Sequence, residues 1–198
     1  MKRTNLVVLT ECSIMVALAF ALSYARVYEM PLGGSVTLAS MLPIMLVSLK
    51  HGSNVGLGAG FAYSLTQLFQ ALLAGNVFPY CETGTTLALC VLFDYIIPFT
   101  LLGLANVFNG TKLFKNNEIS FYAGTAIVVF IRFICHFITG VAIWGQWAPN
   151  GMGKYLYSFL YNGSFLGADF VICIIVAILI LRNREVRHLV GIGNVKSK

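Results

Sequence analysis

Hydrophobic residues fall into six long runs along the chain, separated by short stretches rich in glycine and polar residues. The runs cover residues 6–27, 36–50, 54–75, 84–108, 119–144 and 156–182. An α-helix rises about 1.5 Å per residue and a bilayer core is about 30 Å thick, so about twenty apolar residues cross it. All runs but the second reach that length. The pattern predicts an all-α integral membrane protein with six transmembrane helices, in one membrane-embedded domain over residues 1–198.

The second run, 36–50, is too short for a straight crossing, because its length as a helix would be only about 22 Å. It also contains Pro43, and the chain enters it through residues 29–35, where a proline and two glycines disfavour a regular helix. We expect a short or tilted second helix. Irregular backbone at membrane depth is tolerated only where it is buried in protein or lines a cavity.

The connections between the runs are short, so neighbouring helices should be antiparallel, and the basic residues then give the orientation. With both termini in the cytoplasm, the outer side holds only Arg26 and Lys154, and Arg132 lies within a run. The inner side holds Lys2, Arg3, Lys50, Lys112, Lys115, Arg182, Arg184, Arg187, Lys196 and Lys198. This asymmetry predicts outer loops at 26–36, 76–83 and 145–155.

Composition supports a membrane protein and excludes several other classes. Hydrophobic residues make up 58% of the chain and charged residues only 10%, against about 25% charged in soluble domains. A soluble enzyme, a disordered chain and a disulfide-rich secreted module are therefore excluded. The net charge of +6 does not indicate nucleic-acid binding, because the basic residues sit at the ends of apolar runs. The cysteines show no metal-ligand spacing, and no metal or cofactor is expected.

Four ionisable residues lie inside the runs, where a charge costs about 2.5–3.5 kcal/mol. They are Asp94, Arg132, His136 and Asp169. Asp94 and its neighbour Tyr95 either face a cavity for a cationic or amino-bearing ligand, or Asp94 pairs with Arg132. Arg132 and His136 are four residues apart and share a helix face, and Trp144 is expected on the same stripe. Arg132 and Asp169 are interpreted as structural, and His136 either as a ligand contact or as a hydrogen-bonded core residue.

Aromatic residues are concentrated in residues 144–164, which also contain an asparagine. An interfacial aromatic belt explains Trp147 and Tyr155 but not Tyr157 and Asn162, which lie inside the last run. An asparagine at that depth must find hydrogen-bond partners. These residues therefore indicate a site that forms hydrogen bonds to a heteroaromatic ligand.

Two ladders of small residues repeat at intervals of four. Ala17, Ala21 and Ala25 form one ladder, and Gly52, Gly56 and Gly60 form the other. Both allow close approach of a second helix. We expect the glycine ladder to pack within this chain.

Three blocks of sequence resemble the thiamine-specific S-components of energy-coupling factor (ECF) transporters, the YuaJ/ThiT family. They are residues 30–43 (MPLGGSVTLASMLP), 93–95 (FDY) and 136–163, which includes HFITG, WGQWAP and YSFLYNG. The resemblance extends over most of the chain, and the last block is the most specific of the three. It implies a six-helix membrane protein that captures thiamine from outside.

The resemblance also implies partners and a lid. A separate module, consisting of a transmembrane coupling subunit and two ATPase subunits, would drive uptake. This agrees with the absence of a phosphate-binding GxxxxGK[ST] loop from the chain. In such S-components a small-residue ladder on the first helix contacts the coupling subunit, and Ala17, Ala21 and Ala25 match it. The first outer loop, 26–36, would act as a lid over the ligand.

The resemblance assigns six residues to the ligand. Asp94 would face the thiazolium cation, Tyr95 and His136 would line that ring, and Trp144 would stack on the aminopyrimidine. Tyr157 and Asn162 would form hydrogen bonds to the pyrimidine edge. Some relatives have an aromatic residue where this chain has Gly34 and another where it has Pro149. The cover would then be formed differently, by Tyr28, Met30 or Trp147.

Three alternatives stay open at this point. The chain is an S-component for another vitamin or a thiamine precursor, or a membrane-embedded enzyme that uses His136 and a carboxylate, or a structural subunit of a membrane complex. No serine elbow, HExxH or paired-acid motif supports an enzyme. The Trp, His, Asp and Asn residues expected at one membrane depth argue against a purely structural subunit.

Overall fold

The fold is described from a computed structural model, which covers residues 3–75, 78–114 and 116–192. Four helical stretches in this part of the chain are long and apolar enough to cross a membrane. They are Asn5–Tyr24, Gly84–Leu104, Asn117–Ala142 and Lys154–Leu181. Two further helices complete the predicted six: α2 (Leu42–His51), with 10 residues, and α3 (Ser53–Leu73), with 21.

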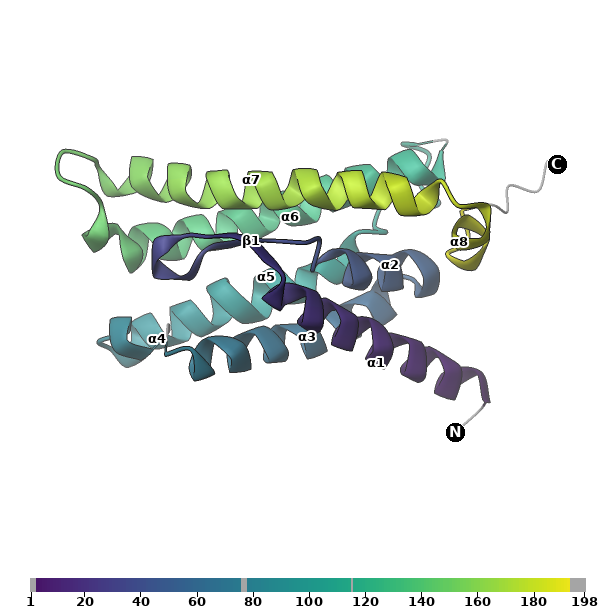
Figure 1. The fold of residues 1–198 in the computed structure, drawn as a ribbon, viewed down its shortest axis with the longest axis horizontal. Coiled ribbons are helices and arrows are strands. Elements are labelled where there is room, and N and C mark those ends of the chain that lie inside the picture. The colour runs from purple at the N-terminus through teal and green to yellow at the C-terminus, as the bar shows by residue number, and fades with distance from the viewer. Residues whose placement is uncertain (1–2, 76–77, 115, 193–198) are drawn as a thin grey trace.

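The helices form two groups with a hairpin between them (Figure 1). The long helices α6 (Asn117–Ala142) and α7 (Lys154–Leu181) pack along each other. On the other side, α3 packs against a continuous helix made of α4 (Gly84–Cys90), η3 (Val91–Ile96), α5 (Ile97–Thr100) and η4 (Leu101–Leu104). The remaining short elements are η2 (Phe78–Tyr80), η5 (Trp144–Trp147) and α8 (Arg184–Leu189).

The segment between the first two helices is a β-hairpin, which the sequence pattern did not predict. Strands β1 (Arg26–Glu29) and β2 (Ser35–Thr37) pair antiparallel, with Tyr28 opposite Val36 and a register shift between Arg26 and Tyr28. The short 3-10 turn η1 (Pro31–Gly33) connects them. The expected helical runs 6–27 and 36–50 are therefore both shortened, and α1 (Arg3–Tyr24) ends before the hairpin.

The second helix is short, as predicted, and it is the most completely buried element. Pro43 lies in the first turn of α2, where a missing backbone N–H is tolerated, so the helix begins at Leu42 instead of near residue 36. All of its residues from Leu42 to Leu49 are buried. The helix therefore does not face lipid but forms the centre of the inner half of the molecule.

The glycine ladder packs within the chain, as predicted. A Cβ on Gly56 would lie 2.4 Å from the carbonyl oxygen of Gly103, and one on Gly60 would lie 2.5 Å from that of Thr100. Neither position tolerates a side chain, so α3 and the α5–η4 helix approach backbone to backbone. Gly52 has a different role: its φ of 86° lets the chain turn between α2 and α3.

The described basic residues of the predicted inner side gather at one end. The start of α1, the end of α2 and the short helix α8 all lie at that end, and the hairpin and the start of α7 lie towards the other (Figure 1). This arrangement agrees with both termini on the cytoplasmic side. Lys2, Lys115, Lys196 and Lys198, which also entered that prediction, lie outside the described residues.

Candidate functional site

One cavity lies between the two helix groups, beside the hairpin. Its wall includes all six residues predicted to contact a ligand. Gly34 also lines it, whereas the three other cover candidates, Tyr28, Met30 and Trp147, do not. The lining comes from α1, α3, η3, α5, α6, η5, α7 and the hairpin, so residues from opposite ends of the sequence meet here.

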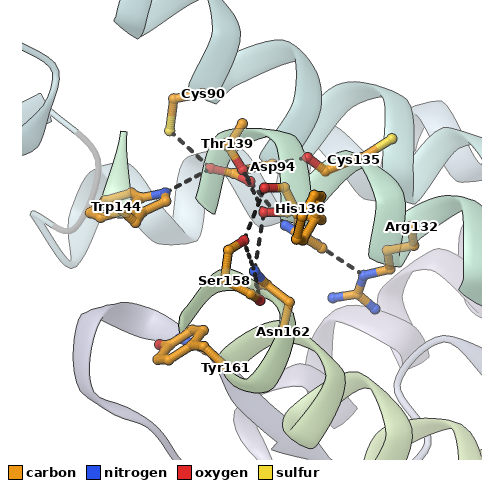
Figure 2. Close-up of polar contacts among 12 residues, drawn as sticks. Cys90, Asp94, Arg132, Cys135, His136, Thr139, Trp144, Ser158, Tyr161 and Asn162 are labelled. Atoms are coloured by element: carbon orange, nitrogen blue, oxygen red, sulfur yellow. Dashed lines mark hydrogen bonds and ion pairs between the residues drawn. The ribbon is translucent and has the colours of Figure 1, made fainter. Parts of the chain in front are cut away.

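Asp94 reaches this cavity from a π-helical turn. Residues Val91–Ile96 form η3, an i→i+5 turn inside an otherwise α-helical span. Such turns insert one residue into a helix and are frequent at functional sites. Asp94 is 9% exposed, and its carboxylate is held by several donors (Figure 2).

Four side chains contact the Asp94 carboxylate. Oδ1 accepts a hydrogen bond from the Thr139 hydroxyl and lies 2.9 Å from Nδ1 of His136. Oδ2 lies 3.3 Å from Nε1 of Trp144, which donates to it, and 3.4 Å from Sγ of Cys90. The carboxylate is therefore fixed in orientation before any ligand arrives.

His136 connects this carboxylate to Arg132. Its Nε2 lies 3.3 Å from Nε of Arg132, which can only donate a hydrogen. The imidazole therefore carries its proton on Nδ1, donates to Asp94 and is neutral. Asp94 is thus held by a neutral histidine, and its negative charge is not cancelled by this contact.

The alternative that Asp94 pairs with Arg132 is wrong. Arg132 instead forms an ion pair with Asp169, with Nη1 and Oδ2 3.8 Å apart, and its guanidinium lies over the Phe99 ring. Asp169 is 1% exposed and accepts from the backbone N–H of Thr37 at 3.0 Å and from its hydroxyl at 2.9 Å. The pair therefore ties α6 and α7 to strand β2, which confirms its structural interpretation.

Trp144 reaches Asp94 by another route than the one predicted. The sequence placed it on the same helical stripe as Arg132 and His136, but α6 ends at Ala142 and Trp144 begins the 3-10 turn η5. This turn directs the indole towards Asp94 (Figure 2). Trp144 also packs against Trp147 and Tyr80, with ring centroids 5.7 and 5.3 Å away.

Asn162 is fixed on α7 by its amide nitrogen. Its Nδ2 donates to the backbone oxygen of His136 at 3.1 Å and to that of Ser158 at 2.9 Å. Gly140 makes this approach possible, because a Cβ there would lie 2.1 Å from Oγ of Ser158. Oδ1 of Asn162 has no hydrogen-bond partner among the described residues and is an acceptor in the cavity wall. Tyr157 lies one turn away on the same wall.

Tyr161, which the sequence analysis did not single out, holds the hairpin over this wall. Its hydroxyl accepts from the Gly34 N–H at 3.0 Å and donates to the Pro31 carbonyl oxygen. A Cβ on Gly34 would lie 2.9 Å from that hydroxyl, so a side chain at 34 would require Tyr161 to move. Tyr157, Tyr161 and Phe165 are spaced by four, a signal that would have placed Tyr161 on the cavity face.

The other cover candidates lie outside the cavity. Tyr28 is 61% exposed and Trp147 is 38% exposed. Met30 packs beside Tyr161 and Phe165 at the edge of the hairpin. In the described parts of the chain, no group of three or more His, Cys, Asp and Glu side chains is arranged to hold a metal ion.

The alanine ladder points away from the cavity. Ala17 and Ala21 lie on the exposed face of α1, and Ala25 follows the helix end. Only 11% of the most apolar window of α1 is buried, against 33–39% for the other three apolar helices. The first helix therefore presents most of its surface to lipid or to another protein.

Comparison with known proteins identifies the family. The family model described as "Thiamine transporter protein (Thia_YuaJ)" matches residues 9–188. The chain belongs to this family. The resemblance seen in the motifs is thereby confirmed, and the protein is a multi-pass protein of the bacterial cell membrane.

Two curated relatives of this family cover nearly the whole chain. The thiamine transporter ThiT of Bacillus subtilis (strain 168) is 33% identical over 187 residues, which cover 89% of this chain and 91% of the relative. ThiT of Lacticaseibacillus paracasei is 29% identical over 186 residues, which cover 89% and 88%. The fold is also that of a solved structure of ThiT from Listeria monocytogenes, with a TM-score of 0.72 and 23% identity, covering 93% of this chain and 98% of that one.

Proposed function

We propose that this protein is the substrate-binding membrane subunit of an ECF importer and that it captures thiamine from outside the cell. The observation that carries the proposal is the Asp94 carboxylate. It is held in a ring-lined cavity by neutral donors, and no lysine or arginine of the described residues forms an ion pair with it. Membership of the thiamine transporter family supports the same ligand.

The charge in the cavity wall favours a cation. Four charged side chains line it, and two of these, Arg26 and Arg132, are engaged by Glu29 and Asp169. Asp94 is left as the uncompensated charge. Thiamine carries a permanent positive charge that no proton loss can remove. A carboxylate about 4 Å from it contributes about 4 kcal/mol at an effective dielectric of about 20, and a desolvated cation–π contact contributes about 2 kcal/mol.

The α7 wall suits the aminopyrimidine. The free Oδ1 of Asn162 would accept from the exocyclic amino group, and the Tyr157 hydroxyl would form a hydrogen bond to the ring edge. Trp144 offers a flat ring for stacking, whereas Tyr95 and His136 would lie against the thiazolium. In this arrangement Tyr161 takes over the covering role that an aromatic residue at position 34 has in some relatives.

The binding experiment uses the two tryptophans of the chain. Thiamine is titrated into the detergent-purified protein while tryptophan fluorescence is recorded. Saturable quenching that persists in Trp147→Phe and disappears in Trp144→Phe is the expected result. A response to another vitamin but not to thiamine would keep the fold and replace the substrate. Silence with all vitamins, or a new product formed from a ligand or lipid, would overturn the proposal.

Energy for uptake would come from a separate module, bound through α1. We expect Ala17→Trp to leave thiamine affinity unchanged and to prevent co-purification with the coupling subunit, because the bulky ring blocks close helix approach. Leu18→Trp is the matched control, since Leu18 is exposed at 45% on a neighbouring face. Co-purification of the Ala17→Trp variant at the wild-type level would exclude this face as the contact.

A further inference from the structure

Two glutamines on α3 present unpaired amide groups to the same cavity. Nε2 of Gln67 and Nε2 of Gln70 are buried and have no hydrogen-bond partner among the described residues. Both residues line the cavity, and Gln70 is only 8% exposed. They are three residues apart and therefore share one helix face. Buried polar groups are almost always paired, so this pair of amides needs an explanation.

The contacts of Gln70 define what it can bind. Its Oε1 lies 3.2 Å from Oγ of Ser23, whose own hydrogen has a closer acceptor in the Phe20 carbonyl oxygen, at 2.7 Å. The two ends of the amide can therefore be exchanged, with Nε2 then donating to Ser23. In either orientation one polar end of Gln70 stays unpaired. A ligand hydroxyl group can pair with Gln70 in either orientation, because it can donate a hydrogen bond to Oε1 or accept one from Nε2.

The two glutamines line the cavity from α3, whereas the pyrimidine wall lines it from α7. Helix α3 and helix α7 are on opposite sides of the molecule, with α5 and α6 between them (Figure 1). In the proposed function the pyrimidine lies against Asn162 and Tyr157 on α7, and the thiazolium lies at Asp94. On that five-membered ring, the hydroxyethyl arm and the bridge to the pyrimidine occupy non-adjacent positions and point away from each other. The arm then extends towards α3.

We propose that Gln67 and Gln70 form the subsite for the primary alcohol at the end of the ligand. This inference rests on the proposed function. The alcohol would fill the hydrogen-bonding capacity that both amides leave open, and it would do so without adding charge near Asp94. The subsite would select ligands that carry a hydroxyl at this end over ligands of equal shape that carry a methyl group.

The test compares thiamine with its analogue in which the hydroxyethyl arm is replaced by propyl, so that only the hydroxyl becomes a methyl group. Both are titrated calorimetrically into wild type, Gln67→Met and Gln70→Met. Methionine keeps the length and helix propensity of glutamine and removes the amide. Gln146→Met is the matched control, since Gln146 is exposed and does not line the cavity.

We expect wild type and Gln146→Met to bind thiamine about three- to tenfold more tightly than the propyl analogue, the range of one or two neutral hydrogen bonds. In Gln67→Met and in Gln70→Met, the preference for thiamine over the propyl analogue should fall to about twofold or less. If wild type binds both ligands equally, the subsite is wrong although thiamine binding stands. If wild type binds neither, the proposed function itself fails. Equal binding of the two ligands by wild type overturns the subsite even where a variant does not fold.

Discussion

The cavity wall around Asp94 and the hairpin that covers it are built in different ways. Asp94 is buried and held by four side chains. Cys90 lies on the same continuous helix as Asp94, His136 and Thr139 lie on α6, and Trp144 lies in η5. The hairpin strand β1 is exposed along its whole length. Besides the packing of Met30 and Val36 and a Ser164–Met30 contact, two groups of side-chain hydrogen bonds hold the hairpin to α7. These are the Tyr161 contacts to Pro31 and Gly34, and the Asp169 contacts to Thr37.

Because they are built differently, the wall and the hairpin should affect ligand binding in different ways. The side chains of the wall are already held in place before the ligand binds. Binding therefore loses little conformational entropy there, and the contacts with the ligand contribute almost fully to the binding free energy. A cover held by a few hydrogen bonds can open, and its contacts control how long a bound ligand stays. Changes in the wall should therefore lower affinity strongly, and changes in the hairpin should lower it less, through a faster dissociation rate.

The largest effect is expected for Asp94→Asn. The amide keeps the shape of the side chain but removes the charge opposite the ligand cation, and we expect thiamine affinity to fall about 100-fold or more. Isothermal titration calorimetry measures it. Glu82→Gln is the control, because it also removes a carboxylate on the outer side but does not line the cavity. Wild-type affinity in Asp94→Asn would show that the carboxylate does not select the cation.

A smaller effect is expected for Trp144→Phe. Phenylalanine keeps a ring for stacking but reduces its area and removes the Nε1 hydrogen bond to Asp94, whose other partners remain. We expect affinity to fall by up to about tenfold. Trp147→Phe, which lies outside the cavity, should leave it unchanged. A loss in Trp144→Phe that exceeds the loss in Asp94→Asn would reverse the ranking of charge over stacking.

The wall could be predicted from sequence far better than its cover. Asp94 and His136 stand out as ionisable residues in apolar runs, and the six ligand residues that the family resemblance implies do line one cavity. The helical runs follow from length and apolarity alone. These signals are local, because each can be seen in a single segment.

The hairpin and its contacts depend on tertiary structure and were missed. The order of hydrophobic and polar residues in 26–37 does not distinguish a short hairpin from an irregular loop. The π-helical turn at Asp94 likewise has no sequence signal of its own. The link from Asp169 to Thr37 joins residues 132 positions apart. Trp144 was placed correctly in space for the wrong reason, because a regular helix was extended two residues too far.

The base of the hairpin is tested by Thr37→Val. Valine has the shape of threonine, so the change removes the buried hydroxyl, with its hydrogen bond to the Asp169 carboxylate and its hydrogen bonds with Ser40, and leaves the backbone bond to Asp169 in place. Thr37 and Asp169 are both buried, so bulk water replaces the lost bond between them less easily than a bond at the surface. We expect dissociation of thiamine to become about three- to tenfold faster, with little change in association. Stopped-flow fluorescence measures both rates, and an unchanged dissociation rate would separate the hairpin base from ligand release.

The smallest effect is expected for Tyr161→Phe, which removes only the hydroxyl. Gly34 N–H and the Pro31 carbonyl oxygen lose their partner, but both lie near the surface and water can replace it. We therefore expect dissociation to become about two- to threefold faster, while the ring still covers the cavity beside Gly34. Tyr155→Phe is the matched control, because Tyr155 is 63% exposed and does not line the cavity. If Tyr161→Phe instead lowered affinity as much as Asp94→Asn, the hydroxyl would belong to the ordered wall, and the division between wall and cover would be wrong.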